Sequence, residues 1–354
     1  MPRLRTQPNW PGGRVTNFVH QSSALRDNPW GDPSDRPVNV YLPAAYSEQA
    51  EPFVCLWDLA AFTNAGPGHL NWQNHGENLP SRLDRLIGLG SMPPTVVVLP
   101  DCFTTLGGNQ YVNSPSVGNY ADYIVHELVP AVDARFNVIS HRNGRGVFGK
   151  SSGGFGALHL AMTYDECWGA VASHSGDVCF DLVYRPAFAE ACSVLADYNG
   201  NIEEFIRTFW ASNRPAGRDF TTLMVLAMAA SYDPDFENPG SIRLPFDLRT
   251  CTLDPQRWSQ WLSHDPVNLV ETCAGALRSL HGLYLDVGRY DQYNIQFGSR
   301  ILADKMAKLG IKFRYEEFDG THSGIDWRLD YSLPFLAGVL KNAASLPGKE
   351  KREQ

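Results

Sequence analysis

Three features are missing from this sequence of 354 residues, and each absence excludes a class of protein. The longest apolar run, residues 223–230, is far shorter than the roughly 20 residues that a membrane-spanning helix needs. No apolar stretch follows the charged N-terminus, so no secretory signal is predicted. The 30 Lys and Arg residues are outnumbered by 38 Asp and Glu residues, and a net charge of −8 argues against a nucleic-acid binder. We therefore expect a cytoplasmic protein with no membrane or nucleic-acid partner.

Cysteine is present, but not in a pattern that binds metal or builds a disulfide framework. The seven cysteines are odd in number, and no two of them form a Cys-x-x-Cys pair. Zinc ribbons and disulfide-rich domains depend on such spacings. We therefore expect most of these cysteines to be small buried apolar residues.

Short strand patterns alternate with helical patterns along most of the chain. Residues 36–42 alternate apolar and polar side chains, and residues 95–99 form a β-branched run. Further strands are expected at 53–57, 147–148, 168–172, 281–287 and 312–318. Helices are expected at 120–136, 155–164, 296–309 and 330–344. This alternation predicts an α/β fold with a mostly parallel central sheet and helices on both faces.

One long segment departs from that alternation. Residues 178–280 contain helical patterns and many prolines but no convincing strand. We predict that this segment is a helical cap, or lid, inserted into an α/β core made of residues 1–177 and 281–354. The remaining core then has the usual size of one domain.

Two overlapping motifs predict different chemistry around residue 151. Gly144–Ser151 fits G-x-x-x-x-G-K-S, the phosphate-binding P-loop, and Gly149–Gly153 fits G-x-S-x-G, the nucleophile elbow. A P-loop needs free backbone N–H groups before its lysine, whereas Val147 and Phe148 belong to a strand pattern. We therefore favour the elbow, with Ser151 as nucleophile, and keep the P-loop as the alternative.

A serine nucleophile needs a histidine base and an acid that orients it. His322 lies in a loop of small residues just after the last expected strand, where a catalytic histidine has to project. Asp291, in the loop after the 281–287 strand, is the favoured acid. Asp286 is the alternative, although its place inside the strand pattern fits a structural role better.

Two backbone N–H groups are expected to form the oxyanion hole. One is that of Ser152, directly after the nucleophile, and the other comes from the loop at Ala60. We expect further residues to border the substrate pocket, because they lie near these positions or have aromatic side chains in the segment 178–280. They are Leu59, Lys150, His174, Trp210, Trp258 and Trp261.

These motifs together resemble one family of α/β-hydrolases, the family described as "Putative esterase". It includes S-formylglutathione hydrolases, feruloyl and other carbohydrate esterases, enterochelin esterases and mycolyltransferases. The resemblance runs from about residue 14 to 343 and rests on VNVYLPAAY, FVCLWD, VVVLPD, YADYIVHELVPAVDARF, GKSSGGFGALHLAM, VASHSG, VGRYDQY and DGTHSGIDW. It implies the α/β-hydrolase fold, Ser151, Asp291 and His322 as the triad, and oxyanion amides at Ser152 and about Ala60.

The chain also departs from the family pattern. Asp58-Leu59 stands where the family usually has His-Gly or Asp-Gly, and Gly324 replaces an aromatic residue. Lys150 replaces a residue that is often apolar or His. Lys150 is expected to be either a surface salt-bridge partner or a contact for an anionic substrate.

We therefore expect a serine hydrolase of the carboxylesterase type, with no metal or organic cofactor. It would cleave a small-molecule ester, or a thioester, through an acyl-enzyme. Acyl transfer by the same triad remains an alternative, and a P-loop nucleotide binder is a less favoured one. Assembly into a homo-oligomer is compatible with the sequence.

Overall fold

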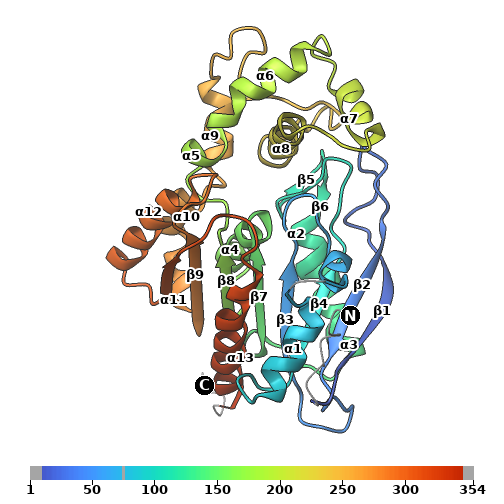
Figure 1. The fold of residues 1–354 in the computed structure, drawn as a ribbon, viewed down its shortest axis with the longest axis vertical. Coiled ribbons are helices and arrows are strands. Elements are labelled where there is room, and N and C mark those ends of the chain that lie inside the picture. The colour runs from blue at the N-terminus through green and yellow to red at the C-terminus, as the bar shows by residue number, and fades with distance from the viewer. Residues whose placement is uncertain (1–9, 74–75, 346–354) are drawn as a thin grey trace, which may run out of the picture.

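The computed structural model describes residues 10–73 and 76–345. Its centre is an eight-stranded sheet with the order β1-β2-β4-β3-β7-β8-β9-β10 (Figure 1). Neighbouring strands from β4 to β10 are parallel, and only β2 runs antiparallel to both of its neighbours. The strands are β1 (Arg14–Gln21), β2 (Asp35–Leu42), β3 (Val54–Leu59), β4 (Thr95–Pro100), β7 (Arg145–Lys150), β8 (Ala170–His174), β9 (Gly282–Gly288) and β10 (Arg314–Phe318). The mostly parallel α/β fold predicted from the sequence is confirmed.

Helices cover both faces of this sheet, because each strand sends alternate apolar side chains to opposite sides. Val97 and Leu99 of β4 pack with α1 (Leu79–Gly88) and α13 (Leu329–Ser345). Val96 and Val98 face the other side, which carries the remaining core helices. These are α2 (Tyr120–Asp122), η2 (Tyr123–Leu128), α3 (Val129–Arg135), α4 (Ser152–Thr163) and α12 (Ile295–Lys308).

Two elements of the core were not predicted. β1 is an edge strand whose side chains are mostly exposed or half-buried, so it carries little of the apolar signal on which strand prediction depends. α1 buries only one stripe of leucines, Leu79, Leu83 and Leu86, and a proline lies in its first turn. A small hairpin of β5 (Asn113–Ser114) and β6 (Gly118–Asn119) also lies outside the main sheet.

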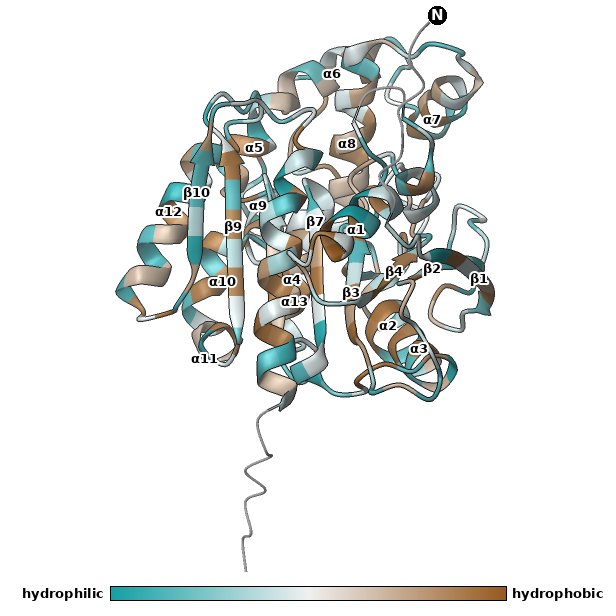
Figure 2. Ribbon diagram, turned by 60° about the horizontal axis from the view of Figure 1, so that its bottom comes forward, coloured by the Kyte–Doolittle hydropathy of each residue, from teal (hydrophilic) through white to brown (hydrophobic). Residues whose placement is uncertain are grey.

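The segment 178–280, which was expected to be helical, contains the α-helices that the structure describes between β8 and β9. They are α5 (Phe180–Val183), α6 (Phe188–Ala196), α7 (Ile202–Ala211), α8 (Gly217–Tyr232), α9 (Pro255–Leu262), α10 (Pro266–Thr272) and α11 (Ala274–Arg278). The helices from α5 to α9 lie beyond the carboxyl ends of the strands, at the top of Figure 1, and Figure 2 shows α6 and α7 at the top of the molecule. In contrast, α10 and α11 pack against α4, and α10 also contacts α12, beside the sheet.

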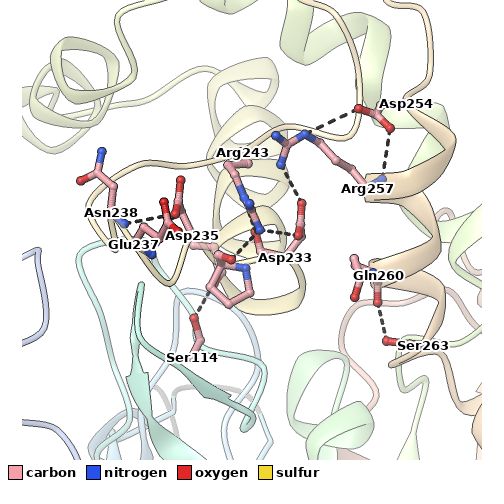
Figure 3. A network of polar contacts seen from close by, with 12 residues as sticks. Ser114, Asp233, Asp235, Glu237, Asn238, Arg243, Asp254, Arg257, Gln260 and Ser263 are labelled. Carbon is pink, nitrogen blue, oxygen red and sulfur yellow. Dashed lines mark hydrogen bonds and ion pairs between the residues drawn. The ribbon is translucent and has the colours of Figure 1, made fainter.

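Ion pairs hold the end of α8 to the segments that follow it. The buried carboxylate of Asp233 accepts hydrogen bonds from Arg243 at 2.7 Å and from Arg257 of α9 at 3.0 Å (Figure 3). Ser114 of the β5–β6 hairpin donates to the carbonyl of Ala230 in α8 at 2.6 Å. Ion pairs therefore connect the end of α8 to the segments that follow it, and the hydrogen bond from Ser114 connects α8 to the core. Within residues 10–73 and 76–345, no helix has the length and apolar character needed to cross a bilayer.

Candidate active site

Ser151 lies on a sharp turn between β7 and α4. Its backbone adopts φ 55° and ψ −126°, a strained conformation for a residue with a side chain. The turn is tight because a Cβ atom on Gly153 would lie 1.9 Å from the carbonyl oxygen of Leu59. A Cβ atom on Gly149 would lie 2.4 Å from the Gly153 carbonyl carbon. The G-x-S-x-G spacing thus allows strand and helix to approach closely around an outward-facing serine.

The same geometry excludes the P-loop alternative. Arg145–Lys150 is a strand, β7, paired on one side with β3 and on the other with β8. Its backbone groups therefore belong to the sheet ladder and are not arranged as a phosphate-binding loop. Gly144–Ser151 matches the P-loop pattern only in spacing.

His322 and Asp291 form a buried hydrogen-bonded pair. Nδ1 of His322 donates to Oδ2 of Asp291 at 2.8 Å, and the Asp291 side chain is inaccessible to solvent. The other carboxylate oxygen of Asp291 accepts the backbone N–H of Tyr293 at 2.9 Å. The Tyr293 ring packs edge-on against the imidazole, with 4.8 Å between ring centroids. Both the carboxylate and the imidazole are therefore held in fixed orientations.

Ser151 and His322 line the same cavity, which has a volume of about 270 Å³. Residues from the core and from the insertion contribute to its wall. The lining residues are Ala61, Phe62, Lys150, Ser151, Ser152, Asp177, Val183, Tyr184, Phe220, Met224, Tyr293, His322 and Ser323. The structure thus brings together Ser151, Asp291 and His322, which are far apart in the sequence. Ser151 and His322 line the cavity, and Asp291 contacts His322 from behind the cavity wall.

The two residues expected to supply the oxyanion amides differ in their position relative to the cavity. Ser152 lines the cavity at the start of α4, as expected. Ala60 is buried and is absent from the cavity lining, whereas Ala61 lines it. Tyr111 donates its hydroxyl to the Ala60 carbonyl at 2.6 Å, which fixes the peptide that carries the Ala61 N–H. Because a trans peptide directs its C=O and N–H oppositely, this bond turns the Ala61 N–H away from Tyr111.

Two further residues of the predicted pocket lie outside the cavity. Leu59 is fully buried at the end of β3. His174 is also buried and borders a neighbouring cavity of about 230 Å³, with Nδ1 2.7 Å from Asp286 and Nε2 2.8 Å from Ser332. Asp286 in addition accepts a hydrogen bond from Arg328 at 2.7 Å. Both His174 and Asp286, the alternative acid, are therefore bound within a structural network beneath α13.

The three tryptophans of the insertion do not line the cavity either. Trp261 is fully buried and packs against Trp258, whose indole donates to Asp181 at 3.2 Å. Trp210 is 44% exposed, and its indole donates to the carbonyl of Thr105 at 2.7 Å. The aromatic contribution of the insertion to the cavity comes instead from Tyr184 and Phe220.

Lys150 lies in the wall between two cavities. It lines the triad cavity and also a second one of about 230 Å³, which His69 and Asp58 border. His69 Nδ1 is hydrogen-bonded to Asp58, whose carboxylate raises the pKa of the imidazole against the opposing effect of burial. Burial lowers the pKa of Lys150. Lys150 forms no ion pair with any residue within 10–73 and 76–345. The surface salt bridge that the sequence allowed is therefore not found among these residues.

Sequence reasoning missed several residues of the site. Asp177 and Tyr293 follow the ends of β8 and β9, where polar residues of an α/β site collect, and this position was the available signal. Ala61, Phe62 and His69 belong to none of the quoted motifs, and Asp58 of FVCLWD was noted only as a departure from the family pattern; the fold brings these residues beside the elbow.

Comparisons with known proteins identify the family and the fold of the chain. The profile of the family described as "Putative esterase" matches residues 33–332. Esterase Rv1288 of Mycobacterium tuberculosis is 28% identical over 172 residues, which cover 46% of this chain and 32% of that protein. The chain thus spans about a third of the length of that curated relative.

Solved structures show the same fold at low sequence identity. A ferulic acid esterase is 18% identical with a TM-score of 0.59, and the match covers 94% of this chain and 100% of that one. An S-formylglutathione hydrolase from Agrobacterium tumefaciens is 17% identical with a TM-score of 0.55, covering 95% and 99%. The chain therefore has the α/β-hydrolase fold and belongs to the "Putative esterase" family.

Proposed function

We propose that this protein hydrolyses small-molecule carboxylic esters through an acyl-enzyme formed on Ser151. The observation that carries the proposal is the 2.8 Å bond between His322 Nδ1 and Asp291, next to a cavity that His322 shares with the strained Ser151. This bond leaves Nε2 of the imidazole as the atom that can take a proton. Family membership supports the same reaction class.

The reaction proceeds in two steps. Ser151 Oγ attacks the ester carbonyl while His322 accepts its proton, and His322 then protonates the departing alcohol. A water molecule next attacks the acyl-enzyme, with His322 again as base. Asp291 keeps the proton on Nδ1 and stabilises the imidazolium that forms in each step.

The backbone N–H groups of Ser152 and Ala61 are proposed to stabilise the oxyanion. Both residues line the cavity, and neither N–H has a backbone acceptor among the turn and loop contacts of the described residues. Loss of one such donor typically lowers kcat about 10²–10³-fold.

We also propose that the segment between β8 and β9 serves as the cap of this cavity. α8 supplies Phe220 and Met224, and Val183 and Tyr184 come from the first turns of the segment. These four side chains line the cavity together with Ala61 and Phe62 of the core. A thioester would fit the same machinery, and an alcohol that replaced water would give acyl transfer.

The decisive test compares wild type and Ser151→Ala with p-nitrophenyl butanoate. We expect the variant to lose at least about 10⁴-fold in kcat, because residues of a triad act as a unit. Labelling by a fluorophosphonate should disappear in parallel. Undiminished hydrolysis by the variant would refute the proposal, and products formed with added alcohols would separate hydrolysis from acyl transfer.

A further inference from the structure

A second carboxylate lies in the wall of the triad cavity and takes no part in the triad. Asp177 follows β8, is 5% exposed and lines the cavity. Asp291 already occupies Nδ1 of His322, so Asp177 is not the acid that orients the imidazole. Its presence there needs another explanation, because an acidic side chain is rarely buried without a partner.

One oxygen of this carboxylate is fully engaged. Oδ2 of Asp177 accepts a hydrogen bond from the Tyr184 hydroxyl at 2.7 Å, and from the Ser152 hydroxyl and the Gln110 amide at 3.3 Å each. The Gln110 amide also donates to the hydroxyl of Tyr232 at 2.8 Å, which ties the group to α8. These contacts fix the orientation of the carboxylate before any substrate arrives.

The other oxygen is free. Oδ1 of Asp177 accepts no hydrogen bond from any residue within 10–73 and 76–345, yet it does not belong to the fully enclosed polar atoms that lack a partner. Asp177 lines the triad cavity and also a much smaller one of about 10 Å³ beside α4, so Oδ1 is the oxygen left for a molecule bound in the triad cavity. Burial raises the pKa of Asp177, although the three donors and the nearby His322 oppose this effect. A buried carboxylate oxygen without a partner is stabilised when a bound molecule donates a hydrogen bond to it.

We propose that Oδ1 of Asp177 binds a hydroxyl or ammonium group that the substrate carries close to its scissile carbonyl. The proposal rests on the proposed esterase function, and it narrows the substrate class. Ser152 sets the distance, because its hydroxyl contacts Asp177 while its backbone N–H is the proposed oxyanion donor. The carbonyl oxygen of the substrate would thus bind the backbone N–H of Ser152. The nearby donor of the substrate would bind Asp177, which the Ser152 hydroxyl contacts.

The first experiment uses the wild-type protein and three p-nitrophenyl esters with matched acyl groups. These are the esters of butanoate, 3-hydroxybutanoate and 3-aminobutanoate. Each kcat/KM is divided by the rate of hydrolysis in hydroxide, which removes differences in chemical reactivity. We expect a preference of about 10-fold or more for at least one donor-bearing ester over butanoate. The preferred arm identifies the donor as hydroxyl or ammonium, and no preference in either arm would overturn the proposal.

The second experiment compares Asp177→Asn with Tyr184→Phe. The first variant removes the charge of the carboxylate, and we expect the preference for the amino ester to fall about 10-fold or more, or that for the hydroxy ester several-fold. Tyr184→Phe removes one of the three donors to Oδ2, and Ser152 and Gln110 still hold the carboxylate with Oδ1 free, so the preference should remain. Equal loss on all three esters in Asp177→Asn would mean a structural role and contradict the proposal.

Failure of the proposed esterase function would look different. In that case none of the three esters would be hydrolysed, and Ser151 would not react with a fluorophosphonate. If Asp177→Asn does not fold, the wild-type preference alone decides the matter.

Discussion

Asp286 and Asp291 lie close together in the sequence but have different surroundings. Asp286, within β9, is bound by His174 and Arg328 beneath α13. Asp291, in the loop beyond β9, is bound by His322 beside the cavity. Both side chains are fully buried, so burial alone does not separate a structural acid from a catalytic one. The partner of each carboxylate decides its role.

Matched substitutions of these two aspartates should separate the roles. We expect Asp291→Asn to lower kcat about 10⁴-fold with little change in stability, because the imidazole loses its orienting acceptor. Asp286→Asn should destabilise the fold by about 3 kcal/mol or more, because Arg328 loses the charge of its buried partner. Ester hydrolysis and urea unfolding measure the two effects. A large loss of kcat in a well-folded Asp286→Asn protein would contradict this division.

At the scale of single elements, two helical glycines have very different surroundings. Gly153, in the first turn of α4, faces the backbone of Leu59. Gly338, in α13, has no heavy atom within 4 Å of the position that a Cβ would take. The same substitution should therefore have opposite effects at the two positions.

Gly153→Ala should prevent correct folding, because its Cβ would collide with the Leu59 carbonyl. Gly338→Ala should stabilise the protein by about 0.5–1 kcal/mol, since alanine loses less backbone entropy in a helix. Soluble yield and the midpoint of thermal unfolding report both results. A normally folded and active Gly153→Ala protein would show that the elbow can relax.

α8 lines the triad cavity with Phe220 and Met224. Its residue Met224 lines the cavity, where it meets the space expected for the acyl group. We expect Met224→Ala to enlarge the cavity and to raise kcat/KM for octanoate relative to acetate esters. Met228, on the same helix but fully buried, is absent from the lining. Met228→Leu is the control, and its chain-length preference should match that of the wild type.

At the scale of the whole molecule, two histidines join the core to the insertion. His159 of α4 stacks on His264, which lies between α9 and α10, with 5.8 Å between ring centroids. Burial lowers the pKa of His159 to about 3 and that of His264 to about 4. The folded state therefore binds fewer protons than the unfolded state between these values and about 6.5, the ordinary value for histidine. Stability is complete above that range and falls as the pH decreases through it.

This linkage predicts the behaviour of His159→Phe. The variant should lose less stability than wild type between pH 6.5 and 4, by up to about 1.4 kcal/mol per pH unit. Urea unfolding at a series of pH values measures the slope, and a variant of the exposed His141 serves as the control. Identical slopes in wild type and His159→Phe would mean that the pair does not control acid unfolding.

Short stretches of sequence were enough to predict the buried strands, the elbow and the position of His322. Continuous β-branched runs predicted the buried strands, because parallel strands bury both of their faces. The glycines around Ser151 predicted the elbow, because only glycine allows the close approach of strand and helix there. His322 followed from its loop after the last strand, at the edge where the strands end.

Only the tertiary structure decided which side chains face the cavity. The tryptophans of the insertion were plausible pocket residues by composition, but packing buries Trp258 and Trp261 among other aromatic rings. Asp177 carried no motif, and its free oxygen becomes evident only when Tyr184 and Ser152 are seen to engage the other one. The direction of a side chain depends on contacts between segments far apart in the chain, and local periodicity does not record those contacts.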